Sequence, residues 1–135
     1  MNTTFAQTIE HCSLKKLLPY AKNARTHSEE QVQQIAQSIK EFGFVNPVLL
    51  GSNDIIIAGH GRLMAAKKLN LDQVPIIRLP HLTEAQQKAL RIADNRIAES
   101  SGWDEDLLRL ELQELDDLGF DLDLLGFEDD ELLNW

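Results

Sequence analysis

The sequence predicts an α+β fold, in which helices cover a small mixed β-sheet and an acidic helical extension follows. Two observations carry this prediction: short β-branched runs alternate with helical periodicity, and the charge changes sign along the chain. Residues 1–98 hold 12 Lys and Arg against 8 Asp and Glu, a balance of +4. Residues 99–135 hold one basic residue and 14 acidic ones, a balance of −13. We therefore expect a domain over 1–98 and an extension over 99–135.

Four short runs predict strands. Residues 7–11 alternate weakly between polar and apolar, and residues 45–50, 55–57 and 74–79 are apolar and rich in β-branched residues. The polar residues 51–54 separate the second run from the third and are typical of a hairpin turn. Pro75 lies near the start of the last run and predicts an edge strand or a strand beginning, because proline cannot donate to a β-ladder.

Helical periodicity predicts four helices, over 28–42, 62–69, 83–99 and 104–118. Ser28 and Thr83 are N-cap residues, and each is followed three residues later by a glutamine that completes a capping box. The first three helices carry apolar stripes that we expect to be buried: Val32, Ile35, Ala36 and Ile39; Leu63, Ala66 and Leu69; and Ala85, Ala89, Ile92, Ala93 and Ile97.

Composition excludes several classes of protein. An apolar fraction of 43% and a charged fraction of 26% are those of a soluble globular domain. No apolar run approaches the roughly 20 residues of a membrane helix, and the N-terminus lacks the pattern of a secretory signal. Cys12 stands alone and cannot form an internal disulfide. We expect a cytoplasmic protein without a membrane partner.

The segment Gly59-His60-Gly61-Arg62 follows a predicted strand and opens a predicted helix. Both glycines permit positive φ and a close approach of the backbone to a ligand. A helix N-terminus attracts anions, and Arg62 adds a planar donor fork suited to phosphate. His60 can donate or accept. The pattern predicts a phosphate-binding turn, with a plain tight turn as the alternative.

The wider context of this turn resembles the ParB N-terminal domain family over about residues 8–98. Four segments match the family in order and spacing: Gly43 to Val48, Ile57 to Arg62, Ala65-Ala66 and Val74 to Ile77. The stretch from Leu18-Pro19 to Arg25 is similar to its opening loop. The resemblance implies the ParB/sulfiredoxin fold and a site for CTP or ATP. It also implies the nucleotide-binding residues Gly59, His60, Gly61, Arg62, Arg25 and Asn46.

A second cluster, Arg91 to Arg96, is similar to a stretch of the family in which a carboxylate and an amide approach Mg²⁺ beside the triphosphate. The resemblance implies Asp94 and Asn95 as metal ligands, and their oxygen atoms suit Mg²⁺. A polar helix face is the alternative. Asn23, Arg25 and His27 would close the site from the opening loop, or would belong to an exposed loop.

The chain departs from the family in two places. His60-Gly61 replaces the family's Glu-Arg, and His60 stands where the related sulfiredoxins carry a reactive cysteine, so sulfiredoxin activity is excluded because it needs a thiolate. We expect no counterpart of the helix-turn-helix domain of full ParB proteins. An acidic helix and a Phe-Asp tail follow residue 98 instead, and the helix has leucines that need burial: Leu107, Leu108, Leu110, Leu112, Leu115 and Leu118.

These features predict a Mg²⁺-dependent nucleotide-binding module of a DNA-associated ParB-like protein, in which any NTP hydrolysis would be slow. Its partners would be nucleotide, DNA and a second copy in a homodimer. The acidic extension would repel phosphate polymers and suit a basic partner, or would be a solvated surface.

Three alternatives remain open. The layout also resembles the N-terminal part of phage and mobile-element DNA methyltransferases, which predicts an accessory module of such an enzyme. Methylase catalytic motifs are missing, so the chain would then be a fragment or a stand-alone relative. A ParB-like DNase is disfavoured because no cluster of carboxylates lies near the basic face. A small-molecule kinase of the same fold is the third alternative.

Overall fold

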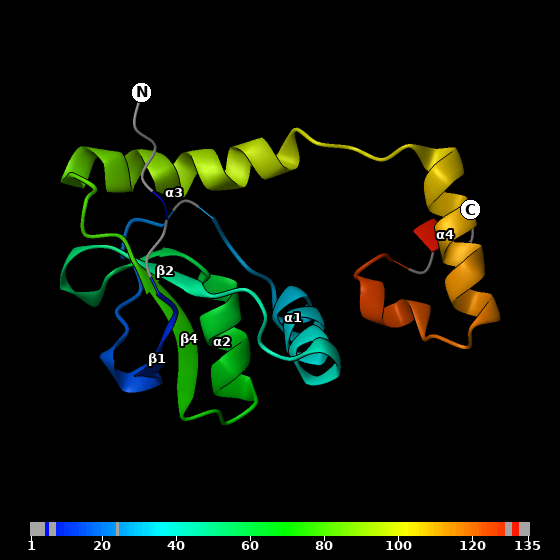
Figure 1. Cartoon of the computed structure of the whole chain (residues 1–135), viewed down its shortest axis with the longest axis horizontal. Coiled ribbons are helices and arrows are strands. Elements are labelled where there is room, and N and C mark those ends of the chain that lie inside the picture. Colours follow the sequence, from blue (N-terminus) through cyan, green and yellow to red (C-terminus); the bar gives the residue numbers. More distant parts are fainter. Residues whose placement is uncertain (1–4, 6–7, 24, 129–130, 133–135) are drawn as a thin grey trace. The chain divides into compact units, whose positions relative to one another are not determined.

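The computed structural model describes residues 5, 8–23, 25–128 and 131–132. The chain divides into two compact units, Met1–Ala98 and Glu99–Trp135. The first unit combines a four-stranded sheet with helices, as expected, and the second is helical (Figure 1). No helix within the described ranges is long and apolar enough to cross a membrane.

The sheet of the first unit is mixed, as predicted. Its strand order is β1 (Glu10–Ser13), β4 (Gln73–Arg78), β2 (Val48–Leu50) and β3 (Ile56–Ala58). The β2–β4 pair is parallel, and the β1–β4 and β2–β3 pairs are antiparallel. A short 3₁₀ turn over Ser52–Asp54 joins β2 to β3, which confirms the predicted hairpin. The first strand begins three residues later than we predicted.

Pro75 does not mark an edge strand, because β4 lies between β1 and β2. The residue is near the beginning of β4, opposite His11 of β1. Pairing with β2 starts only at Ile76, which is opposite Val48. The missing N–H of Pro75 therefore precedes the ladder on the β2 side, and an interior strand can accept the proline.

Two helices, α1 (Glu29–Phe42) and α2 (His60–Lys68), pack against each other, and α2 also contacts β2. The Oγ atom of Ser28 accepts the N–H of Gln31 at 3.0 Å, so the predicted N-cap is confirmed. The reciprocal half of the capping box is not made, because Oε1 of Gln31 instead accepts from Nδ1 of His27 at 2.9 Å.

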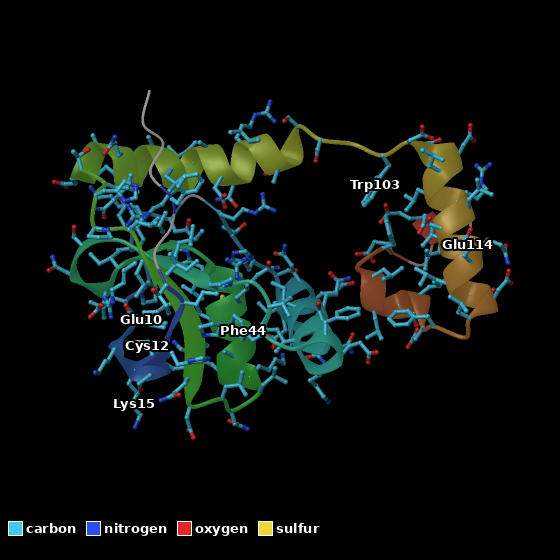
Figure 2. All side chains as sticks on the ribbon, in the orientation of Figure 1. Glu10, Cys12, Lys15, Phe44, Trp103 and Glu114 are labelled. Carbon is cyan, nitrogen blue, oxygen red and sulfur yellow. The ribbon has the colours of Figure 1, made fainter. Side chains whose placement is uncertain are left out.

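The core of the first unit lies between α2 and the sheet. Its largest fully buried side chains come from the strands and from α2: Val48, Leu50, Ile56, Leu63, Val74 and Ile76. Cys12 is buried in the same cluster, and Phe44 packs against it (Figure 2). Val32 and Ala36 of α1 form a second buried cluster with Ala65 of α2, as the predicted stripes require.

Helix α3 (Glu84–Glu99) confirms its predicted cap and corrects its predicted stripe. Thr83 and Gln86 exchange both capping-box hydrogen bonds, at 2.9 and 3.1 Å. Ile92 and Ile97, however, are 65% and 69% exposed. The buried residues of α3 are Gln87 and Arg91.

Hydrogen bonds explain why α3 turns a polar side inward. Gln87 donates to the Ser52 hydroxyl and to the Leu82 carbonyl, and it accepts the Ser52 N–H. Arg91 donates to the carbonyl of Ile56. These partners satisfy the buried polar groups, so the usual cost of burying them is largely avoided.

In the second unit, α4 (Glu105–Asp117) is capped by Asp104 and followed by a 3₁₀ turn over Leu122–Leu125. Leu112 is buried, and Leu108 and Leu115 are half-buried. The predicted apolar side is only partly covered, because three other leucines are exposed: Leu107, Leu110 and Leu118. The rings of Trp103 and Phe127 lie 5.6 Å apart within this unit; Figure 2 labels Trp103.

Candidate functional site

A polar cavity of about 210 Å³ lies at the turn between β3 and α2. Five segments of the first unit contribute to its wall: the opening loop, α1, β3, the turn and α3. The lining residues are Asn23, Arg25, His27, Gln31, Ile35, Ile57, Ala58, Gly59, His60, Gly61, Arg62, Asp94 and Asn95. The structure thus brings together the turn, Arg25, Asp94 and Asn95. Asn46 is exposed and does not line the cavity.

Gly59 allows the chain to pass from β3 into α2. Its φ is +111°, a left-handed conformation that favours glycine. A Cβ atom at Gly59 would also lie 3.1 Å from Cγ2 of Val48 and 3.2 Å from Nη2 of Arg62. The turn therefore requires glycine both for its backbone angle and for the packing around it.

Gly61 is buried where α1 and the opening loop meet α2. A Cβ atom there would lie 2.9 Å from Cδ1 of Ile35 and 3.0 Å from Cε1 of His27. His27 is itself held by Gln31 of α1. The absence of a side chain at Gly61 lets the opening loop come close to the first turn of α2.

The first turn of α2 keeps its donors available. Gly59 is the N-cap and provides no side-chain hydrogen bond to the helix. The first N–H groups of a helix have no acceptor within the helix, and the helix dipole makes this end positive. The N-terminus of α2 therefore has the chemistry of an anion-binding site where it borders the cavity.

Arg62 is the half-buried cation of the site. Its Nη2 atom donates to the carbonyl of Pro47 at 3.0 Å, which fixes the guanidinium. Its Nε atom is buried and has no hydrogen-bond partner among the described residues. Burial lowers the pKa of Arg62, and the carboxylate of Asp94 opposes that shift. A buried donor without a partner is costly, so the residues fit an anionic ligand better than they fit an empty cavity.

His60 has a defined partner. Its Nε2 atom lies 3.0 Å from the backbone nitrogen of Tyr20. Because a backbone N–H can only donate, Nε2 must be unprotonated and the imidazole must be neutral. Burial, followed by the charges of His27 and Arg91, lowers the pKa of His60, which agrees with the neutral ring.

Arg91 and Tyr20 form a contact that sequence reasoning missed. The Nε atom of Arg91 donates to the carbonyl of Ile56 at 3.0 Å, and its guanidinium lies 3.7 Å from the centre of the Tyr20 ring. This distance is well within the range of a cation–π interaction. Arg91 therefore joins α3 to β3 and to the opening loop.

Asp94 and Asn95 reach the cavity from α3. Asn95 donates from Nδ2 to the carbonyl of Arg91 at 2.8 Å. Among the residues that the structure describes, no three His, Cys, Asp or Glu side chains are grouped so that they could hold a metal ion. This donor set fits Mg²⁺ only if a ligand's oxygens and water complete its coordination, as is usual for Mg²⁺ beside phosphates.

Comparison with known proteins identifies both parts of the chain. Residues 2–96 match the ParB N-terminal domain family, and residues 106–134 match the ParB-methyltransferase HTH domain family. The second match corrects our expectation that no helix-turn-helix domain follows. The acidic surplus of residues 99–135 had concealed it, because such domains usually carry basic residues for DNA.

One relative and two solved structures illustrate the relationship. The ParB-like nuclease domain-containing protein YnaK of Escherichia coli is 57% identical over 75 residues, which cover 56% of this chain and 86% of YnaK. A truncated ParB from Caulobacter crescentus, complexed with CTP-γ-S, superimposes with a TM-score of 0.68 at 22% identity. The match covers 81% of this chain and 63% of the ParB chain.

The sulfiredoxin of Arabidopsis thaliana has a TM-score of 0.53 at 20% identity, over 62% of this chain and 97% of the sulfiredoxin. At this identity, both solved structures establish the fold and no more. The family match covers most of the first unit, including the glycine turn and the Asp94-Asn95 pair. The chain belongs to the ParB N-terminal domain family.

Proposed function

We propose that the first unit binds a nucleoside triphosphate, CTP or ATP, together with Mg²⁺, in the cavity at residues 59–62. The observation that carries this proposal is the guanidinium of Arg62, which lines the cavity beside the uncapped N-terminus of α2. Both features offer donors and positive charge to one anion. The complex of the Caulobacter ParB with CTP-γ-S supports a nucleotide as that anion.

The triphosphate would take its contacts from backbone and side chains together. The N–H groups of the first turn of α2 and the guanidinium of Arg62 would hold one phosphate, and Arg25 would approach from the opening loop. Asp94 and Asn95 would reach the phosphates through Mg²⁺. The cavity is smaller than the ~300–1,000 Å³ of most small-molecule sites, so we expect it to hold the phosphates and leave the base near its rim.

The chemistry of the site favours binding over a fast reaction. The neutral His60 already uses Nε2 to hold Tyr20. Any hydrolysis of the nucleotide would therefore depend on a water molecule positioned by the metal. A slow NTPase switch, in which nucleotide changes the surface offered to DNA or to a second copy, fits this arrangement.

A second candidate is an accessory module of a DNA methyltransferase system. The observation that favours it is the match of residues 106–134 to the ParB-methyltransferase HTH domain. In this function the partner would be DNA or the methyltransferase itself. Binding to a methyltransferase without any saturable binding of nucleotide would favour this second candidate over the first.

Calorimetric titration of the full chain with CTP, ATP, GTP and ADP, with and without Mg²⁺, tests the proposal. We expect saturable binding of one triphosphate, stronger with Mg²⁺, and weaker binding of ADP because it lacks one phosphate. Failure of all four nucleotides to bind a folded protein at millimolar concentration would contradict the proposed function.

A further inference from the structure

The opening loop, residues 18–27, is attached to the rest of the first unit at three points. At its start, Leu18 accepts from the N–H of Ile56 and donates to the carbonyl of Asp54, both at 2.9 Å. At its end, His27 contacts Gly61 and is held by Gln31. Between these points, the N–H of Tyr20 donates to Nε2 of His60 across 40 residues of sequence.

The residue that His60 holds also contacts α3. The Tyr20 ring lies under the guanidinium of Arg91, which is hydrogen-bonded to β3 through the carbonyl of Ile56. Arg91 belongs to α3, and α3 carries Asp94 into the cavity. The hydrogen bond of His60 therefore joins the turn to the loop, and the cation–π contact of Tyr20 joins the loop to α3.

The surroundings of His60 suit an acceptor and disfavour a cation. His27 and Arg91 both face it and both oppose its protonation. Arg25, Arg62 and Asp94 line the same cavity, and the carboxylate of Asp94 interacts with Arg62. A neutral ring whose Nε2 accepts from Tyr20 has only its Nδ1–H left to donate.

We propose that His60 is a positioning residue: its Nε2 atom accepts the N–H of Tyr20 and so holds the loop with Asn23 and Arg25 over the phosphate-binding turn. This inference deepens the proposed function and rests on it for its effect on affinity. The hydrogen bond itself can be tested without nucleotide.

Two substitutions separate positioning from direct contact. In His60→Gln, the Oε1 atom can still accept from Tyr20 at a similar reach. In His60→Leu, the volume is retained and the acceptor is lost. We expect the leucine variant to bind the triphosphate about fivefold to tenfold more weakly, as for one lost hydrogen bond. We expect glutamine to restore the affinity to within about twofold of the original chain.

The readout specific to positioning is amide hydrogen exchange of Tyr20 in the full chain without nucleotide. The Tyr20 amide should be protected in the original chain and in His60→Gln, and should exchange faster in His60→Leu. Nitrogen NMR of the original chain should also detect the imidazole protonated at Nδ1 alone at pH 7.5. This second measurement needs no variant, so a leucine variant that fails to fold does not spoil the test.

The outcomes are distinguishable. A ring protonated at Nε2, or a Tyr20 amide that exchanges equally fast in all three proteins, overturns the positioning role. Weaker nucleotide binding in His60→Leu with unchanged protection of Tyr20 also overturns it, and indicates direct contact with phosphate. Protection that follows the expected order in a chain that binds no nucleotide supports the hydrogen bond and refutes only the proposed function.

Discussion

The two units of this chain carry net charges of opposite sign. The first unit gathers Arg25, Arg62 and a helix N-terminus around one cavity, within a sequence whose balance is +4. The second unit carries a balance of −13, and its helix α4 ends without a basic residue in its last turn. A phosphate ligand is attracted to the first and repelled by the second. An HTH match in so acidic a segment therefore does not by itself predict that this unit contacts DNA.

We expect the largest effect on nucleotide binding from replacing Arg62, the half-buried arginine of the cavity. Arg62→Ala should weaken binding of the triphosphate by about 1.5–3 kcal/mol, because it removes a charge-assisted contact in a half-buried site. The matched control is Arg109→Ala, which removes an exposed arginine from the second unit. Calorimetry should detect the loss in the first variant only. An unchanged dissociation constant in a folded Arg62→Ala protein would contradict a contact between Arg62 and the triphosphate.

Glycine replacements should also distinguish the units. Gly61→Ala introduces a Cβ atom 2.9 Å from Ile35 and 3.0 Å from His27, so the loop or α1 must move. We expect a loss of about 1–3 kcal/mol in the free energy of unfolding, as for other overpacked sites. Gly102→Ala in the second unit is the control, since no described residue beyond its two chain neighbours lies within 4 Å of the added Cβ. Urea denaturation measures the free energy of unfolding of both variants. Equal midpoints would mean that the turn accommodates a methyl group at residue 61 without strain.

Replacing Asp94 should weaken binding of the triphosphate only when Mg²⁺ is present. With Mg²⁺, Asp94→Ala should bind the triphosphate more weakly, because a ligand oxygen is lost. In EDTA the same variant should bind equally well or better, because a carboxylate near Arg62 no longer repels the phosphates. Titrations under both conditions provide the test. Equal losses with and without Mg²⁺ would instead indicate that Asp94 supports the fold.

The sequence predicted the parts of the fold that local rules govern. The caps at Ser28 and Thr83, the hairpin turn and the buried stripe of α1 all depend on neighbours within a few residues. The inward face of α3 does not, because Gln87 and Arg91 find their partners in Ser52 and Ile56, far away in the sequence. An apolar stripe containing Ile92 therefore indicated the wrong face.

The candidate site divides in the same way. Its glycine turn was visible as a local motif, and Asp94 and Asn95 came from the family resemblance. The bond between Tyr20 and His60 spans 40 residues and has no local signal. Asn46 was predicted by resemblance alone, and it lies outside the cavity wall. The HTH match was concealed because acidic composition outweighed the pattern of the helix.

Removing two negative charges from the second unit should change the affinity for DNA modestly. In Glu114→Gln/Asp116→Asn, two exposed negative charges near the C-terminal end of α4 are removed. Non-specific affinity for a DNA duplex should rise severalfold at low salt, because less negative charge repels the phosphates. At high salt the two proteins should bind DNA equally, because salt screens the repulsion between DNA and either protein. Glu41→Gln, in the first unit, is the control. A lower affinity in the double variant would mean that α4 itself contacts DNA.

The smallest expected effect concerns acid stability and belongs to the first unit alone. Burial, with His27 and Arg91, lowers the pKa of His60 below its ordinary 6.5. Between the lowered value and 6.5, the unfolded chain binds more protons than the folded one, so the free energy of unfolding decreases as the pH falls through this range. The stabilisation is fully present above 6.5 and is lost on the acid side. His60→Gln keeps an acceptor for Tyr20 and cannot titrate. The free energy of unfolding of this variant, relative to that of the original chain, should therefore increase from pH 7.5 to pH 5. Urea midpoints of the two proteins across this range measure the difference. Parallel curves would mean that His60 keeps its ordinary pKa and that its Nε2 atom does not accept the N–H of Tyr20.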